Sequence, residues 1–164
     1  MFHGLSLHNW LKGAPIEVVT YNFGSVDSIG VVISCAGDPR LCVPHARFLM
    51  HGVSANFQGN QSLDEKDLDE RIKGLRIDYQ NIARVVADTT GKQTDDILRA
   101  MEARTTLDPE EARRFGLVHE ITSALFPAGA DLTSIDEGGG AQMATGPMQR
   151  PMGMPPHHAS GPTV

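Results

Sequence analysis

The sequence has no long hydrophobic run and no excess of positive charge. Its longest apolar stretches, such as residues 31–33, are far shorter than the roughly 20 residues that a membrane helix needs. Fourteen Lys and Arg against twenty Asp and Glu give a net charge of −6, which argues against binding to a nucleic-acid backbone. No basic segment followed by an apolar one opens the chain, as in a secretory signal. We therefore expect a cytoplasmic protein that binds neither nucleic acid nor a membrane.

Cysteine is also scarce. The chain contains Cys35 and Cys42, whereas small secreted domains held by disulfides normally contain more. Seven histidines are scattered along the chain, and the adjacent pair His157 and His158 lies close to the C-terminus. We expect reduced thiols, no metal site and no cofactor.

The composition changes at residue 127. Residues 127–164 hold 7 of the 17 Gly, 6 of the 10 Pro and 4 of the 7 Met. A segment so poor in β-branched and aromatic residues buries too little surface to offset the entropy of ordering it. We predict an α/β domain at residues 1–126 and a disordered Gly-, Pro- and Met-rich tail at 127–164.

Strands and helices are predicted to alternate within the first 126 residues. Segments rich in apolar and β-branched residues predict short strands at 16–21, 41–43, 47–51 and 117–121. Apolar periodicity and helix-capping residues predict helices at 29–36, 63–88, 94–101 and 109–115. This alternation favours an α/β sheet covered by helices.

The helix at 63–88 has the clearest sequence signals. Ser62 and Glu65 have the spacing of a capping box, and Gly91 ends the segment. Apolar residues recur along one face at steps of three and four: Leu68, Ile72, Leu75, Tyr79, Ile82 and Val86. Such a stripe must pack against the protein's own core or against a neighbouring subunit.

Ser28 and His51 are the residues with the clearest chemical potential. Ser28 follows a predicted strand and opens a helix, where backbone amides favour an alkoxide or an oxyanion. Serine at a helix start is more often a simple N-cap. His51 closes the apolar strand 47–51, and a histidine there is either a packed core residue or the base that a serine nucleophile requires.

Several segments carry a resemblance to a known family. In chain order they are Gly24-x-x-x-Ser28-Ile29-Gly30, residues 40–47, Phe48-Leu49-Met50-His51, the long capped helix, Thr90-Gly91-Lys92-Gln93 and residues 109–118. Over about residues 4–122 they are similar, jointly and in the same order, to the proteolytic subunit of Clp protease.

The resemblance implies a crotonase-like ββα fold with a long "handle" helix and a serine peptidase that cleaves polypeptides. Ser28 falls on the family's nucleophile and His51 on its general base. The amide of Ile29, the next residue, would be an oxyanion donor. The resemblance further implies a homo-oligomeric ring through the 63–88 helix and a Clp-type ATPase partner.

Two departures from the family bear on activity. Arg104 stands where the family has its triad aspartate, and a guanidinium cannot accept the imidazole proton. Glu102 is the nearest carboxylate before it and is our candidate to orient His51, while Asp108 is better explained as a helix cap. A backbone carbonyl can also orient a histidine, so Glu102 is not the only possible partner. The family's first strands, including the Gly-Gly strand that supplies the other oxyanion donor, are expected to be missing.

Two alternatives to an active peptidase therefore stay open. One is a catalytically impaired pseudo-protease or structural ring subunit of the same fold, favoured by Arg104 and the short N-terminus. The other is a crotonase-type acyl-CoA enzyme, which shares the fold and stabilises an enolate with paired amides. Titration with an acyl-CoA would separate the second from the first.

Overall fold

The computed structural model describes residues 2–54, 62–124, 130–136 and 139–144. The chain divides into two units between Leu125 and Phe126. The first unit contains, in order, α1 (Phe2–Gly13), β1 (Thr20–Asn22), β2 (Ser25–Asp27), α2 (Ile29–Ser34), β3 (Arg40–Cys42), β4 (Arg47–Leu49), α3 (Glu65–Thr90), α4 (Thr94–Glu102), β5 (Thr106–Leu107), α5 (Pro109–Phe115) and β6 (Glu120–Ile121).

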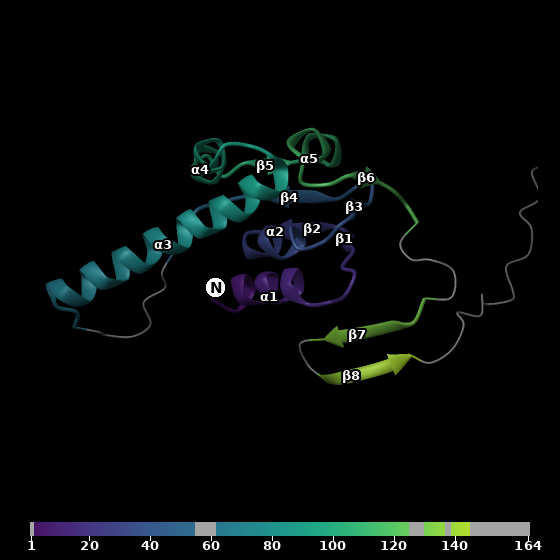
Figure 1. Ribbon diagram of the computed structural model, residues 1–164, viewed down its shortest axis with the longest axis horizontal. Helices are drawn as coiled ribbons and strands as arrows, with labels where there is room; N and C mark the ends of the chain where they lie inside the picture. The colour runs from purple at the N-terminus through teal and green to yellow at the C-terminus, as the bar shows by residue number, and fades with distance from the viewer. Residues whose placement is uncertain (1, 55–61, 125–129, 137–138, 145–164) are drawn as a thin grey trace, which may run out of the picture. The chain divides into compact units, whose positions relative to one another are not determined.

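The strands of the first unit form two small sheets, with strand orders β1-β3-β6 and β2-β4-β5. All pairs in the first sheet are parallel, and β2 pairs in parallel with β4. Strand β5 is antiparallel to β4. Helices α2, α3, α4 and α5 lie around these strands (Figure 1). The predicted mixed α/β class, with parallel strands and one long helix, is confirmed.

Several strands are shorter than the sequence predicted. The segment 16–21 was expected to be extended throughout, but β1 begins at Thr20, where pairing with Arg40 of β3 starts. Ile16 and Val19 lie outside the ladder and are 56% and 43% exposed. A β-branched residue favours a strand through packing against neighbours, and these two residues lack such packing.

Helix α3 is capped two residues later than predicted. Asp64, not Ser62, is the N-cap, and its carboxylate accepts a 2.8 Å hydrogen bond from the Asp67 backbone amide. The Asp67 side chain accepts in turn from the Asp64 amide, which completes the box. A carboxylate is favoured at a helix N-terminus because its negative charge is also attracted by the positive end of the helix dipole. Gly91 ends the helix at φ 70°, as predicted.

The apolar stripe of α3 divides into two halves. Toward the C-terminal end Val86 is buried, and Tyr79 and Ile82 pack against the core of the first unit. Toward the N-terminal end, Leu68 and Ile72 remain 44% and 45% exposed. The stripe therefore contributes to the protein's own core over half its length, and leaves an uncovered apolar face over the other half.

The core lies where α3 and α4 meet α2 and the strand β4. Its largest fully buried side chains are Phe48, Ile97, Met101, Leu117, Val31, Val32 and Val86, together with both cysteines. Cys35 and Cys42 are free and buried, in keeping with the reduced state that we expected. Ala83 and Ala87 of α3 are also buried, and small residues of this kind let neighbouring elements approach α3 closely.

Helix α5 has both ends that the sequence predicted. The Asp108 carboxylate accepts from the Glu111 amide at 2.7 Å, and the Glu111 carboxylate accepts from the Asp108 amide at 2.9 Å. Gly116 ends the helix in the left-handed conformation, with φ 94°. Asp108 is thus committed to capping, as we expected from its position before Pro109.

The second unit contains a hairpin of β7 (Leu132–Asp136) and β8 (Gly139–Ala144), which pair antiparallel. We had predicted no regular structure anywhere in residues 127–164, so this hairpin corrects the prediction for its strands. The β-branched Thr133 and Ile135 favour a strand locally, and averaging the composition over the whole segment concealed them. Residues 145–164, including His157 and His158, lie outside the described residues. Within the described part of the chain, no helix has the length and hydrophobicity of a membrane span.

Helix α1 is joined to α2 through a buried histidine. The His8 Nδ1 atom donates a 2.8 Å hydrogen bond to the Val32 carbonyl, and the His8 side chain is 7% exposed. Burial lowers the pKa of His8 below its ordinary 6.5, and the nearby Lys12 acts in the same direction. The folded protein therefore holds His8 neutral at pH values where the unfolded chain takes up a proton.

We expect this histidine to make folding sensitive to acid. The unfolded state binds more protons, so the free energy of unfolding falls as the pH drops below about 6.5 and until the lowered folded pKa is reached. Denaturant titrations across this range should show a smaller acid-dependent loss for His8→Gln than for the wild type. His3→Gln changes an exposed histidine of the same helix and should retain the full loss. Equal losses in the wild type and His8→Gln would contradict the prediction.

Candidate active site

The parallel register of β2 and β4 brings Ser28 and His51 to the same edge of the sheet. Asp27 pairs with Leu49, the last residue of β4, and the Ser28 amide donates a 2.8 Å hydrogen bond to the Leu49 carbonyl. The chain therefore leaves both strands side by side, with Ser28 immediately after β2 and His51 two residues after β4. Because parallel strands present their carboxyl ends together, residues far apart in sequence converge here.

Ser28 has a backbone conformation that is rare for a residue other than glycine. Its φ is 57° and its ψ is −121°, and its side chain makes no capping hydrogen bond to α2. Ser28 is therefore at the N-cap position of α2, but its side chain does not cap the helix. Such a conformation costs about 1–3 kcal/mol, and residues that adopt it cluster at active sites and ligand sites. The hydroxyl of Ser28 is left available for another purpose.

His51 is oriented by the backbone carbonyl that follows it. The Nδ1 atom lies 2.7 Å from the Gly52 carbonyl oxygen, and the side chain is half-buried. A carbonyl oxygen can only accept, so Nδ1 carries the hydrogen in this contact. In the neutral ring the lone pair is then on Nε2, which is the atom that a general base uses in a serine hydrolase.

Ser28 and His51 both line one cavity of about 90 Å³. The rest of its wall is mainly aliphatic and comes from α2, the segment after β4, α3 and α4: Ile29, Val31, Val32, Met50, Gly52, Val53, Ser54, Ile82, Val86 and Met101. Ser28 and His51 therefore line the same small and mainly apolar pocket. This combination is typical of sites that bind and react with a ligand.

The amide of Ile29 lies at the first helical position of α2. The first amides of a helix have no partner within that helix, so this N–H is not used by the α2 ladder. The side chain of Ile29 is held closely by α1, since a Cβ added at Gly4 would lie 2.2 Å from its Cγ1 atom. Helix α1 therefore packs closely against the residue next to Ser28.

Glu102 is not brought to this cavity. It is the last residue of α4, it is exposed, and it is absent from the described cavity lining. Its negative charge acts on Tyr79, whose pKa is raised first by burial and second by Glu102. The His51 ring is hydrogen-bonded to the Gly52 carbonyl, the kind of backbone partner that was the alternative to Glu102.

Arg104 lies two residues before β5, and His51 lies two residues after β4. Strands β4 and β5 pair Leu49 with Thr106, and the Met50 amide donates to the Thr105 carbonyl at 2.9 Å. His51 and Arg104 each lie one residue beyond this hydrogen bond, outside the two strands. Arg104 has φ 53° because it follows the C-cap of α4, where its amide and that of Thr105 bond back to the carbonyls of Met101 and Ala100.

The sequence did not reveal most of the cavity wall. Ile82 and Val86 belong to the apolar stripe of α3 that we identified, but the pattern did not indicate that this stripe reaches the serine. Met101 was predicted to lie in a helix, but nothing in the sequence indicated that it lines the cavity. These residues come from elements distant in sequence, and only the packing of α3 and α4 over the strand ends joins them.

Comparison with known proteins agrees with this architecture. A mixed α/β fold with a serine and a histidine at one cavity is compatible with several kinds of hydrolase or acyl-transfer protein. The family model described as Clp protease matches residues 1–124. The chain therefore belongs to the Clp protease family, as the motifs around Ser28 and His51 predicted.

Three relatives illustrate the match. ATP-dependent Clp protease proteolytic subunit 3 of Rhizobium meliloti is 32% identical over 124 residues, covering 74% of this chain and 62% of the relative. Proteolytic subunit 2 of Corynebacterium efficiens is 28% identical over 127 residues, covering 76% and 62%. Proteolytic subunit 1 of Corynebacterium jeikeium is 28% identical over 124 residues, covering 74% and 64%. This chain thus spans less than two thirds of the length of these relatives.

Proposed function

We propose that the protein is a serine-type endopeptidase of the Clp kind, with the crotonase-like ββα arrangement of that family. The observation that carries this proposal is the cavity shared by Ser28 and His51. The uncapped Ser28 hydroxyl and the hydrogen on Nδ1 of His51 support it further, because they leave one group to attack and one lone pair to accept a proton.

The proposed reaction proceeds through an acyl-enzyme. His51 Nε2 takes the Ser28 proton as Oγ bonds to the peptide carbonyl carbon, and the Ile29 amide donates to the resulting oxyanion. The C–N bond then breaks, and the proton passes from His51 to the leaving amine. Water then gives a proton to His51 as it attacks the carbonyl carbon of the acyl-enzyme. The bond from that carbon to the Ser28 Oγ atom breaks, and His51 returns the proton to Oγ. The Gly52 carbonyl supports the imidazolium in place of the aspartate, and Glu102 would act only after a local rearrangement of the segment that follows α4.

The substrate of this reaction would be a polypeptide. An aliphatic cavity of about 90 Å³ beside the nucleophile suits an aliphatic side chain next to the cleaved bond. Neither a metal ion nor a cofactor is needed for this chemistry.

Assembly is proposed by analogy with the family. The relatives are named as proteolytic subunits of ATP-dependent proteases, which suggests an ATPase partner and a homo-oligomeric ring for this chain. The exposed Leu68 and Ile72 on α3 support a contact through the 63–88 helix, since an uncovered apolar face is costly in an isolated subunit.

A catalytically impaired subunit is the second candidate. It is favoured by Arg104, which stands where the family's aspartate is expected, and by the exposed position of Glu102. In that case the protein would contribute a ring surface and no hydrolysis.

Labelling with a fluorophosphonate serine probe, read by intact mass, separates the two candidates. An activated Ser28 gives one adduct, which is lost in Ser28→Ala and strongly slowed in His51→Ala. His45→Ala, which changes an exposed histidine in the turn before β4, should label normally. A folded wild-type protein that takes up no label would favour the impaired subunit.

Replacing Arg104 by aspartate should increase hydrolysis. Aspartate tolerates the left-handed conformation of this position, so the change adds no strain. We expect a gain of at least about tenfold in kcat/KM, because loss of the triad carboxylate costs about 10⁴ in rate in a related mechanism. Arg104→Asn is the matched control, because it has the same shape and backbone preference without the charge. Equal rates for the two variants would show that the Gly52 carbonyl already suffices.

A further inference from the structure

The carbonyl that faces His51 belongs to a glycine. Gly52 lies after β4, outside any helix or strand, and its carbonyl oxygen is 2.7 Å from the His51 Nδ1 atom. Glycine has no side chain to pack, and its backbone has more accessible conformations than that of any other residue. A glycine carbonyl therefore keeps one direction only when groups outside the residue restrict the backbone. The neighbours of Gly52 decide how firmly the His51 ring is oriented.

The ring of Tyr79 lies against Gly52. A Cβ atom added at Gly52 would be 3.4 Å from the Tyr79 Cε2 atom, which is ordinary van der Waals contact. Tyr79 is on α3, about one turn before Ile82, and Ile82 lines the cavity that Ser28 and His51 share. Tyr79 itself is not part of the described cavity lining. Its ring therefore contacts the residue whose carbonyl faces His51 without lining the cavity.

Tyr79 is also held at its other end. Its hydroxyl donates a 3.1 Å hydrogen bond to the Leu98 carbonyl of α4, and the side chain packs against the core of the first unit. Burial raises the pKa of Tyr79, and the charge of Glu102 acts in the same direction, so the hydroxyl stays protonated and remains a donor. The ring is thus held between α3, which carries it, and α4, and it presents a firm surface to Gly52.

We propose that Tyr79 is a positioning residue for the His51 base. Its ring restricts the backbone of Gly52, so that the Gly52 carbonyl stays within reach of Nδ1. The hydrogen is then kept on Nδ1 and the lone pair on Nε2, the atom that takes the Ser28 proton. This inference rests on the proposed peptidase function, and it gives a side chain of α3 part of the task expected of the family's aspartate.

The tautomer of His51 tests this proposal directly. In protein that contains histidine labelled with a nitrogen isotope, two-bond proton–nitrogen correlation spectra show which ring nitrogen carries the hydrogen. The signals of His51 are those that are lost in His51→Ala. Spectra are recorded at about pH 8, above the range in which histidine ordinarily titrates. We expect the hydrogen on Nδ1 in the wild type. Tyr79→Leu, which keeps an apolar residue and a good helix former on α3, should spread it over both nitrogens.

The same variant should lower the reactivity of Ser28. Only a ring with its lone pair on Nε2 can take the serine proton, so the rate of fluorophosphonate labelling should fall with the population of that tautomer. We expect Tyr79→Leu to label about tenfold more slowly than the wild type, a smaller loss than the roughly 10⁴-fold drop caused by the wrong tautomer in a related mechanism. Tyr79→Phe keeps the ring against Gly52 and should restore most of the rate.

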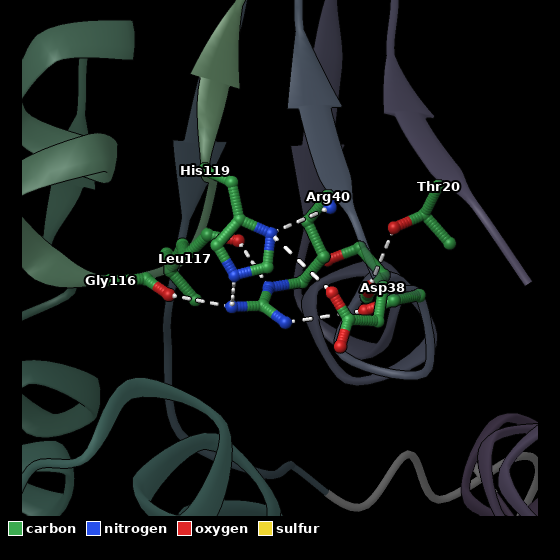
Figure 2. Close-up of polar contacts among 8 residues, drawn as sticks. Thr20, Asp38, Arg40, Gly116, Leu117 and His119 are labelled. Atoms are coloured by element: carbon green, nitrogen blue, oxygen red, sulfur yellow. Dashed lines mark hydrogen bonds and ion pairs between the residues drawn. The ribbon is translucent and has the colours of Figure 1, made fainter.

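Two references separate positioning from a general loss of stability. Val85→Ala removes another side chain of α3 that packs against the core and is not part of the described cavity lining, and it should keep the wild-type tautomer and rate. His119 is the reference within each spectrum. Its ring lies between two donors of Arg40, the backbone amide 3.1 Å from Nδ1 and the Nη2 atom 2.9 Å from Nε2 (Figure 2). This contact joins β3 to the segment before β6, so the His119 signals should be the same in every variant.

The positioning role and the peptidase can fail separately. An unchanged His51 tautomer in Tyr79→Leu, or the same change in Val85→Ala, would overturn the positioning role. If wild-type Ser28 takes up no label while the tautomer still responds to Tyr79→Leu, Tyr79 does orient His51 and the proposed peptidase function is rejected.

Discussion

Ser28→Ala should lower peptide hydrolysis by at least about 10³-fold in kcat/KM, the scale of loss seen when a serine hydrolase loses its nucleophile. The expected loss is large because Ser28 is the hydroxyl that shares the cavity with the His51 ring. The fold should be unaffected, since the Ser28 side chain makes no capping hydrogen bond. The variant is measured with a short fluorogenic peptide that ends in an aliphatic residue, beside a denaturation curve.

Ser25→Ala is the matched control for this experiment. Ser25 lies in β2 and is exposed, and its hydroxyl donates to Asp27 at 2.9 Å outside the cavity. Its removal should leave hydrolysis within about twofold, as expected for a surface change. The Ser28→Ala and His51→Ala changes should not add, because a nucleophile and its base act as one unit. If the double variant were much slower than either single variant, the two residues would not share one step.

A comparison of glycine and alanine at position 28 tests whether the backbone there is strained. If φ 57° at this position is imposed by the β2 to α2 junction, Ser28→Gly should be more stable than Ser28→Ala by about 1 kcal/mol, since glycine adopts this region without a penalty. Both variants lack the nucleophile, so both should be inactive. Activity and stability would then vary independently at one residue, which distinguishes a chemical role from a structural one.

The elements that the sequence predicted well are those specified by local chemistry. The box of Asp108 and Glu111 and the glycines at 91 and 116 act within one turn of helix, so their roles follow from neighbouring residues. The start of α3 was misplaced by two residues because Ser62 and Asp64 both have capping side chains. The stronger acceptor at a helix N-terminus, a carboxylate, is the one that the structure uses.

The site was predictable in part for the same reason. Ser28 and His51 could be singled out because each follows a strand, and the parallel register of β2 and β4 then joins their positions. A backbone carbonyl was one expected partner for His51, but the sequence could not indicate which carbonyl, because a backbone group has no sequence signal. The His119 contact with Arg40 was missed likewise, since it joins residues 79 positions apart through a buried guanidinium.

Phe48→Ala should be the most destabilising single substitution among these predictions. Phe48 is the central residue of β4 and is 1% exposed, and it pairs with Val26 of β2 and Leu107 of β5. Removing the ring leaves a cavity in the core and should cost about 3–5 kcal/mol in the free energy of unfolding. This is a large part of the free energy of unfolding of a typical domain, which is about 5–15 kcal/mol. The measurement is the midpoint of denaturant unfolding, compared between proteins whose free energy of unfolding depends on denaturant concentration with the same slope.

Phe23→Ala provides the comparison for Phe48. Phe23 is 53% exposed and stacks on Tyr21 with ring centroids 5.9 Å apart, so its loss removes little buried surface. We expect a change of less than about 1 kcal/mol. His51 follows β4 by two residues, and β4 supplies the carbonyl that accepts from the Ser28 amide. Phe48→Ala should therefore also slow labelling of Ser28 under conditions where the protein is still folded. A Phe48→Ala protein as stable as Phe23→Ala would mean that β4 does not support the site through the core, and the cavity would then have to be held mainly by α3 and α4.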